Sequence, residues 1–157
     1  MLKSQLRLEF KNKRKQLSKN ERTEMSKMIA KSIIDNFSLT GKTVNIFLPI
    51  ERLNEIDTFF LIEKLLERDV LIAVPVSNFE NHTLKHVIYN SSTILQKNEW
   101  GIPEPINGKE IDAKEIDVVF VPMLSSDKNG FRVGYGKGFY DRFLASCSKK
   151  CVFVGLN

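Results

Sequence analysis

Three glycines alternate with larger residues at Gly134, Gly136 and Gly138, and a helical pattern begins at Phe139. Alternating glycines let the backbone take positive φ and leave no side chains in the way of a ligand. A glycine loop that leads into a helix N-terminus also offers free N–H groups and a favourable dipole to an anion. The pattern therefore predicts a phosphate cradle, with a tight structural turn as the alternative. Its spacing matches neither a Walker A loop nor the dinucleotide fingerprint.

Cations accompany this loop and also crowd the N-terminus. Arg132 and Lys137 flank the glycines, while residues 1–16 hold six basic residues and one acid, which accounts for the whole net charge of +5. Lys3 and Arg7 lie one helical turn apart and point the same way. They could bind polyphosphate or form only a solvated basic face. A nucleic-acid patch is not favoured, because these cations do not interleave with aromatics and no nucleic-acid module is present.

The elements that must position these residues alternate between strand and helix patterns. We expect one domain over residues 1–157 of the α/β class, with three layers, a mostly parallel sheet and helices on both faces. Prolines at 49, 75 and 122 are expected to close strands, and residues 102–115 form the least ordered-looking stretch. The predicted helices cover residues 2–17, 18–37, 59–66 and a segment from 139; the predicted strands cover 44–48, 70–74, 84–89, 117–122 and 151–155.

Apolar side chains at helical spacing predict which faces of the first two helices are buried. Ser18 and Glu21 form a capping box at the start of the second helix. The first helix has an apolar stripe of Leu2, Leu6, Phe10 and Leu17, and the expected core face of the second is Met25, Met28, Ile29, Ile33 and Phe37.

Two further residues are candidates for ligand binding. Glu55 follows the strand at 44–48, where it can serve as a helix-capping acid or as a ligand-binding carboxylate at the carboxyl end of a strand. Trp100 lies in a rigid loop at 100–105 and can be a core plug or the wall of a pocket for a flat ring. His82 and His86 have no neighbours that suggest metal binding or general-base catalysis.

The composition limits the class of protein. Hydrophobic residues make up 42% and charged residues 27%, which is typical of a soluble globular domain. No apolar run approaches the ~18 residues of a membrane span, and the N-terminus lacks the apolar region of a secretory signal. Cys147 and Cys151 are expected to be free thiols in a reducing compartment, so we expect a cytoplasmic protein.

Together, these blocks resemble the signature of the 5-formyltetrahydrofolate cyclo-ligases, also called methenyltetrahydrofolate synthetases. The long glycine signature is specific, and the shorter blocks follow in the right order over essentially the whole chain. They are Lys3-x-x-x-Arg7, Phe47-Leu48, Glu55-Ile56-Asp57-Thr58, Trp100-Gly101-Ile102-Pro103-Glu104-Pro105, Asp117-Val118-Val119-Phe120-Val121-Pro122 and residues 132–142.

The resemblance implies an enzyme that uses ATP and Mg²⁺ to convert 5-formyltetrahydrofolate to 5,10-methenyltetrahydrofolate, with release of ADP and phosphate. It implies that Lys137 and Arg132 are catalytic and that Asp141 is a ligand of Mg²⁺, although Asp141 can also be a first-turn acid facing the helix dipole. The residues implied to bind ATP are Lys3, Arg7, Arg132, Gly134, Tyr135, Gly136, Lys137, Gly138, Phe139 and Tyr140. The residues implied to contact the reduced folate are Leu48, Glu55, Trp100, Tyr135, Gly136, Lys137, Gly138 and Phe139.

One departure from the family pattern concerns the C-terminus. Family members usually continue for a further strand, loop and strand that carry a second acidic residue linked to the metal, whereas this sequence ends at Asn157. We therefore expect the C-terminal strands of the sheet to be missing, which would leave an unpaired strand edge. We expect the protein to be a monomer or a weak dimer. The alternative is that this protein is a homologue that binds ATP or folate without turnover.

Overall fold

The structure is a computed structural model that describes residues 2–157. The helices are α1 (Lys3–Gln16), α2 (Lys19–Asn36), α3 (Phe59–Leu66) and α4 (Phe139–Ser146), with short 3₁₀ turns η1 (Glu51–Leu53) and η2 (Ala113–Glu115). The strands are β1 (Lys42–Ile46), β2 (Val70–Asn78), β3 (Thr83–Tyr89), β4 (Leu95–Lys97), β5 (Pro103–Pro105), β6 (Glu110–Ile111), β7 (Val118–Pro122), β8 (Ser125–Ser126), β9 (Arg132–Val133) and β10 (Val152–Leu156).

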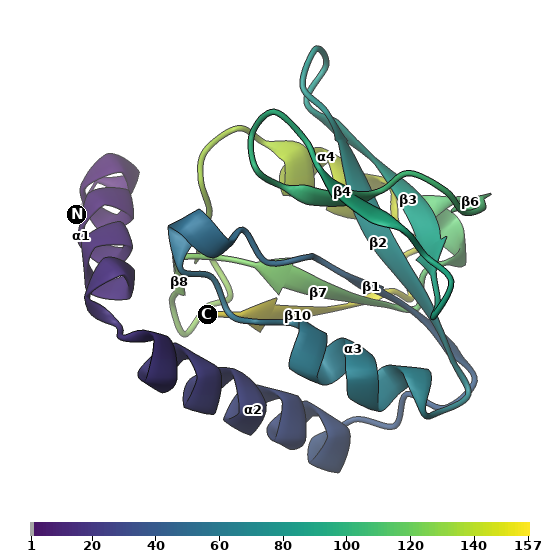
Figure 1. Cartoon of the computed structure of the whole chain (residues 1–157). Helices are drawn as coiled ribbons and strands as arrows, with labels where there is room; N and C mark the ends of the chain where they lie inside the picture. The colour runs from purple at the N-terminus through teal and green to yellow at the C-terminus, as the bar shows by residue number, and fades with distance from the viewer. Residues whose placement is uncertain (1) are drawn as a thin grey trace.

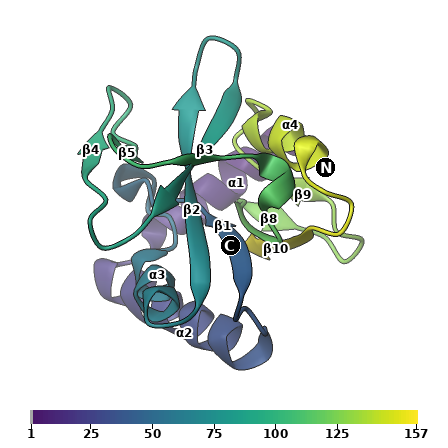
Figure 2. The ribbon, with the colours of Figure 1, turned by 90° about the vertical axis from the view of Figure 1, so that its right-hand side faces the viewer.

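A central sheet runs through the molecule in the order β10-β7-β1-β2-β3-β6. The ladders from β10 to β2 are parallel, and β3 and β6 are added antiparallel. Helices α2 and α3 cover one face and α4 covers the other (Figures 1 and 2). The predicted three-layer, mostly parallel architecture is confirmed. Strand β10 lies at one edge of the sheet.

The connections of the sheet reverse direction between the neighbouring strands β7 and β1. From β1 the chain passes through α3 to β2 on one side, and from β7 it passes through α4 to β10 on the other. Such a reversal leaves a crevice at the carboxyl ends of the two strands, and α/β proteins bind ligands there. The fold alone therefore predicts where a site should lie.

The face that α2 presents to the core differs from the prediction. Ile33 is buried as expected, but Met25 and Met28 are 46% and 70% exposed, and Phe37 is also exposed. The residues buried instead are the small Ser26 and Ala30, which let α2 approach closely. The Ser26 hydroxyl donates to the backbone carbonyl of Arg22 and accepts from the amide of Asp57, so its burial leaves no unpaired polar group.

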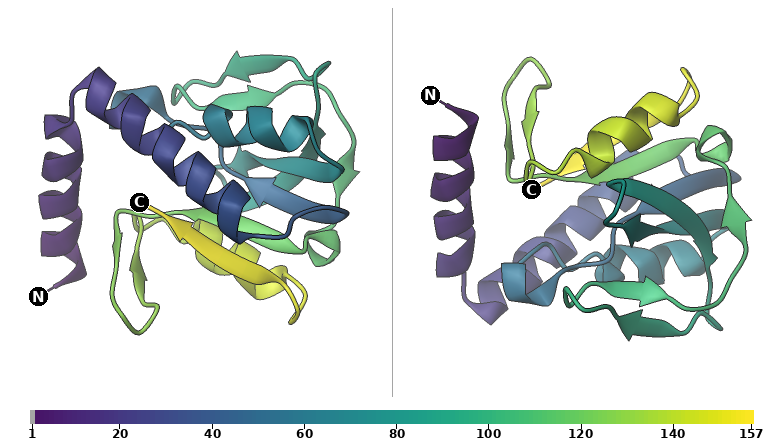
Figure 3. Two further views of the ribbon diagram at one scale, coloured as in Figure 1. Left: turned by 90° about the horizontal axis from the view of Figure 1, so that it is seen from below. Right: turned by 90° about the horizontal axis from the view of Figure 1, so that it is seen from above.

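Helix α1 contributes no buried residue, so its predicted apolar stripe is not a buried seam. The helix stands at one end of the molecule, apart from the sheet (Figure 3). It packs against η1 and β9 rather than against a layer of the core. Its position therefore depends on specific contacts at its surface.

Strand β2 continues beyond the proline that was expected to close it. It pairs with β3 as far as Asn78, with Pro75 opposite His86. The amide of Ser77, two residues on, donates to Glu104 Oε1 on the side away from β3. Successive odd positions direct their backbone groups to the same side, so Pro75 also faces that side, where pairing with β1 has already ended at Ala73. The proline therefore removes no ladder hydrogen bond.

The stretch from 102 to 115 is also more regular than predicted. It contains β5, which pairs with β4, and β6, which pairs with β3, followed by η2. Asp112 caps η2 by accepting from the amide of Lys114. Across residues 2–157, no helix combines the length and the apolar character that crossing a membrane requires.

Candidate active site

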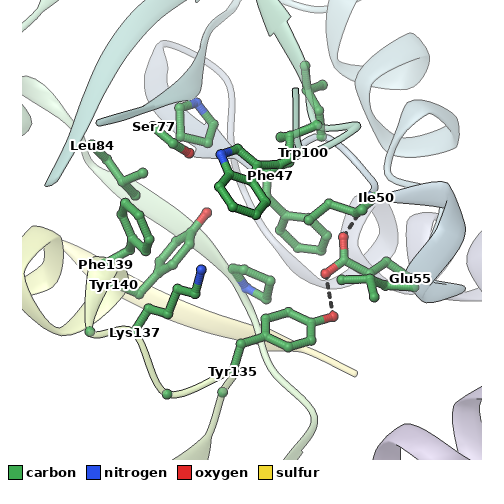
Figure 4. Close-up of a pocket in the computed structure, with 18 of the residues that line it drawn as sticks. Phe47, Ile50, Glu55, Ser77, Leu84, Trp100, Tyr135, Lys137, Phe139 and Tyr140 are labelled. Atoms are coloured by element: carbon green, nitrogen blue, oxygen red, sulfur yellow. Dashed lines mark hydrogen bonds between the residues drawn. The ribbon is translucent and has the colours of Figure 1, made fainter. Parts of the chain in front are cut away.

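A pocket of about 420 Å³ opens at the carboxyl ends of the central strands (Figure 4). This volume is within the range of small-molecule sites. Phe47 and Leu48 follow directly after β1, Pro122 ends β7, and Pro75 and Ser77 come from β2. The pocket thus lies at the reversal point of the sheet.

Every residue that the sequence suggested for binding or catalysis lines this one pocket. The N-terminal helix, the turn after β1, the loop before β5 and the glycine loop all contribute. These residues are Lys3, Arg7, Leu48, Glu55, Trp100, Arg132, Gly134, Tyr135, Gly136, Lys137, Gly138, Phe139, Tyr140 and Asp141.

The glycine loop is packed against helix α1. Arg7 Nε donates to the carbonyl oxygen of Gly134 at 2.9 Å. Gly136 has φ +94°, and a Cβ there would lie 3.0 Å from the Arg7 guanidinium carbon. The positive φ at 136 therefore favours glycine, and a side chain there would also crowd the Arg7 guanidinium. Gly138, in the left-handed conformation, is the N-cap of α4, so the loop leads into a helix N-terminus as predicted.

Glu55 is a buried carboxylate, 4% exposed, that faces the pocket. Its Oε2 accepts from the Ile50 amide at 2.7 Å and its Oε1 accepts from the Tyr135 hydroxyl at 2.6 Å, as Figure 4 shows. Burial raises the pKa of Glu55, while these two hydrogen bonds act against that rise. Glu55 does not cap α3, whose N-cap is Thr58, so the simple capping alternative is excluded.

Phe79 and Trp100 form an aromatic wall of the pocket, next to the glycine loop. The Phe79 ring, at the tip of the β2–β3 hairpin, lies 5.4 Å from the rings of both Trp100 and Phe139. Lys137 Nζ lies 5.2 Å from the Trp100 ring and 5.6 Å from the Phe79 ring, within the distance of a cation–π interaction. Trp100 is 45% exposed, which excludes the core-plug alternative.

The Tyr140 hydroxyl is directed into the pocket (Figure 4). Within the described part of the chain its oxygen is buried and has no hydrogen-bond partner. Burial raises the pKa of Tyr140 well above its ordinary value, so the hydroxyl keeps its proton. A buried unpaired hydroxyl is costly unless a ligand pairs with it, which makes Tyr140 a donor available to a bound substrate.

Asp141 and Arg132 form an ion pair at the rim of the pocket. The Asp141 side chain is 79% exposed and the Arg132 side chain is 24% exposed. Over residues 2–157 no group of three His, Cys, Asp or Glu side chains is placed to hold a metal ion. Asp141 is thus a single carboxylate in the first turn of α4, and protein ligands alone do not form a metal site.

Several pocket residues were missed by sequence reasoning. Arg52 and Phe79 belong to no motif, and Lys11 was counted only as part of a basic helix edge. Arg52 donates from both Nε and Nη2 to the Trp100 carbonyl oxygen, at 3.1 and 3.0 Å, which ties η1 to the loop before β5. The position of Arg52 just before Glu55 was the one sequence signal for its role. Its partner, Trp100, lies 48 residues away and could not be identified from the sequence.

With this geometry in view, comparison with known proteins defines the family. The sequence profile of the 5-formyltetrahydrofolate cyclo-ligase family matches residues 1–154. The chain therefore belongs to that family.

Individual relatives agree with this assignment. A curated mouse (Mus musculus) protein named 5-formyltetrahydrofolate cyclo-ligase is 30% identical over 150 residues, which is 90% of this chain and 73% of the relative. The solution structure of Aquifex aeolicus 5,10-methenyltetrahydrofolate synthetase superposes with a TM-score of 0.81 at 30% identity, covering 99% of this chain and 77% of that one. A Mycoplasma pneumoniae synthetase, at 22% identity and a TM-score of 0.76, supports the fold. The chain thus spans about three quarters of the length of the mouse and Aquifex proteins.

Proposed function

We propose that this protein converts 5-formyltetrahydrofolate to 5,10-methenyltetrahydrofolate with ATP, releasing ADP and phosphate. The single observation that carries the proposal is the pocket. It brings a glycine loop and two N-terminal cations together with a buried carboxylate and an aromatic wall. The first pair of features suits a polyphosphate, and the second suits a flat heterocycle with hydrogen-bond donors. The names of the relatives agree with this combination.

The reaction explains why both kinds of feature are needed. A formamide oxygen is a poor nucleophile and a poor leaving group. Transfer of the γ-phosphoryl group of ATP to that oxygen converts it to a phosphate ester. The neighbouring N–H nitrogen of the folate then attacks the formyl carbon and releases its proton to solvent, the ring closes, and phosphate leaves with the former formyl oxygen. Phosphoryl transfer asks the protein chiefly for positioning and for neutralisation of charge.

We assign the phosphate-binding part of the site to α1 and the glycine loop. Lys3 and Arg7 would neutralise the ATP phosphates, and backbone N–H groups of residues 134–138 would donate to phosphate oxygens. Lys137 would leave the aromatic wall to stabilise charge that develops on the transferred phosphoryl group, with Arg132 beside it. The Tyr140 hydroxyl would donate to the nucleotide from the end of the loop.

We assign the folate-binding part to the other side of the pocket. The free lone pairs of the Glu55 carboxylate would accept hydrogen bonds from N–H groups of the reduced pterin. Leu48 and Trp100 would pack against its ring system, and Tyr135 and Phe139 would close the site from the glycine loop. The formyl group would then lie between the two parts, within reach of the γ-phosphate.

The metal ion, on this proposal, arrives with the nucleotide. Mg²⁺ is commonly held by one or two carboxylates together with substrate phosphates. Asp141, exposed at the pocket rim beside the phosphate-binding loop, fits this role once its ion pair with Arg132 opens. The ion would neutralise phosphate charge. If Asp141 contributes, chelation of Mg²⁺ will weaken calorimetric binding of ATP to the wild-type protein, and will weaken it less in Asp141→Asn.

The activity is tested by following the absorbance of 5,10-methenyltetrahydrofolate formed from 5-formyltetrahydrofolate. We expect a rise that requires ATP, and stoichiometric release of phosphate measured in parallel. Calorimetric binding of both substrates without any methenyl product would contradict turnover and leave a binding protein. Absence of binding as well would contradict the assignment of the pocket.

A further inference from the structure

Arg14 connects three elements of the site without lining the pocket itself. It comes from the last turn of α1. Its Nη1 donates to the Tyr135 hydroxyl at 3.0 Å, and its Nη2 donates to the carbonyl oxygen of Met123 at 2.7 Å. The Tyr135 hydroxyl in turn donates to Glu55 Oε1 at 2.6 Å. A chain of hydrogen bonds therefore runs from Arg14 through Tyr135 to the buried carboxylate.

Chemistry fixes the direction of every proton in this chain. A guanidinium group can only donate, so the Tyr135 oxygen must accept from Arg14. The single hydroxyl proton is then directed to Glu55, which in its ionised form can only accept. When Glu55 is ionised, the chain has a charged group at each end, and hydrogen bonds with an ionised partner are the strong ones. Without Arg14, the hydroxyl could rotate and leave Glu55 Oε1 unpaired.

A second contact joins the same helix to the same turn. Asn54 Nδ2 donates to the carbonyl oxygens of Arg14 and Leu17, at 2.8 and 3.0 Å, at the C-terminal end of α1, where the Arg14 carbonyl also accepts from the Leu17 amide. Asn54 immediately precedes Glu55. The Arg14 backbone thus contacts Asn54 directly, and its side chain is linked to Glu55 through Tyr135.

We propose that Arg14 is a positioning residue of this enzyme, which orients the Glu55 carboxylate through Tyr135 and holds α1 in register with the glycine loop. The inference rests on the proposed function, because it takes Glu55 as the acceptor for the reduced pterin. Arg7, two helical turns earlier on the same side of α1, makes the matching contact with Gly134. Arg14 would thereby couple the folate-binding and phosphate-binding parts of the site.

The charges around Glu55 predict how Arg14 affects pH dependence. Burial raises the pKa of Glu55, and the positive charges of Arg14 and Arg52 act to lower it. Loss of Arg14 therefore raises the pKa of Glu55 further, so protonation removes the acceptor at a higher pH. The groups that face Glu55 are Arg14 from α1, Arg22 from α2, Arg52 from η1, Tyr135 from the glycine loop and Tyr140 from α4.

The test compares Arg14→Gln with Lys15→Gln, which removes the same charge from an exposed neighbouring position. Calorimetry with 5-formyltetrahydrofolate alone, over a range of pH, measures binding without requiring turnover. We expect Arg14→Gln to weaken folate binding about tenfold, as loss of one charge-assisted hydrogen bond would. Its acid limit of binding should move to higher pH, and Lys15→Gln should match the wild type in both respects.

Two further variants separate positioning from a general loss of structure. Arg14→Lys keeps the charge but cannot make both donations, so the acid limit should return toward the wild-type pH while affinity stays reduced. In a Tyr135→Phe background, Arg14→Gln should add little, because the link is already broken. Full additivity, or equal folate affinities for Arg14→Gln and Lys15→Gln, would overturn the inference. Wild-type binding without methenyl formation would refute the proposed reaction alone, and no folate binding would overturn both.

Discussion

Replacement of Glu55 by glutamine should separate folate binding from stability. The carboxylate is 4% exposed and accepts from the Ile50 amide and the Tyr135 hydroxyl. Glutamine has the same shape, and its oxygen can still accept from Ile50. Its NH₂ group can donate to the Tyr135 oxygen, whose own proton then turns toward the pocket. The variant therefore loses the charge while leaving no buried amide unpaired.

The expected magnitudes follow from these contacts. A hydrogen bond to a charged group contributes about 1.5–3 kcal/mol, so affinity for 5-formyltetrahydrofolate should fall roughly 10- to 100-fold. The free energy of unfolding should change by no more than about 1 kcal/mol, since a similar shape and nearly all hydrogen bonds remain. A domain of this size would then shift its Tm by only about 2–4 °C.

The dependence on pH gives a second signature. Because burial raises the pKa of Glu55 above its ordinary 4.5, the folded protein binds this proton more tightly than the unfolded chain does. Ionised Glu55 therefore opposes folding at neutral pH, and this opposition is relieved as pH falls through the raised pKa. Folate binding should be lost over the same range. Glu55→Gln should show neither change.

Calorimetry with the folate and thermal unfolding followed by circular dichroism measure the two quantities. Glu51→Gln is the matched control, because the Glu51 side chain is 73% exposed and its carboxylate lies 3.6 Å from Lys97 Nζ. That variant should keep wild-type folate affinity. If Glu55→Gln binds folate as tightly as the wild type, Glu55 is not the acceptor. A loss of several kcal/mol in stability would instead show that the charge holds the turn together.

Other changes should have equally distinct effects. Lys137→Ala should lower kcat by about 10²–10³, as loss of a group that stabilises transition-state charge does, in the methenyl absorbance assay. Gly136→Ala should weaken ATP binding, measured by calorimetry, because the backbone at 136 has a positive φ and Arg7 lies close by. Gly134→Ala, where a Cβ meets nothing within 4 Å, should fold normally by circular dichroism. Burial lowers the pKa of His86 from 6.5 to about 4, so the free energy of unfolding should fall by up to about 3 kcal/mol as the pH drops from 6.5 to about 4. His86→Gln should abolish this loss, and chemical denaturation at several pH values measures it.

Local patterns predicted the main elements and the conformation of the glycine loop before α4 well. The Ser18–Glu21 capping box is formed, since each side chain pairs with the other's backbone amide. Gly138 caps α4 in the left-handed conformation that the glycine pattern indicated. Such features depend on neighbours within a few residues, so the sequence contains the whole interaction. The family signature then brought together residues from four separate parts of the chain.

Predictions failed where the outcome depended on distant partners. Met25 and Met28 have the spacing of a core face, but the buried face is turned toward Ile33 and Ser26, and the Ser26 hydroxyl pairs with the Asp57 amide, 31 residues away. Arg14 was one cation among several until its contacts with Tyr135 and Met123, more than 100 residues on, were visible. Periodicity ranks side chains by polarity and cannot detect that a small polar residue has a buried partner.

On the proposed function, the way in which α1 is held explains why these distant contacts would matter. No residue of the helix is fully buried, although Leu6 and Phe10 are partly buried, so apolar packing does not enclose it as it encloses α2 and α3. Its contacts with the rest of the site are polar and directed: Arg7 to Gly134, Arg14 to Tyr135 and Met123, and Asn54 to the end of the helix. Directed contacts fix orientation more closely than apolar surfaces do. If the glycine loop binds ATP as proposed, a helix held in this way would keep Lys3 and Arg7 in a fixed position relative to that loop, and phosphoryl transfer depends on such positioning.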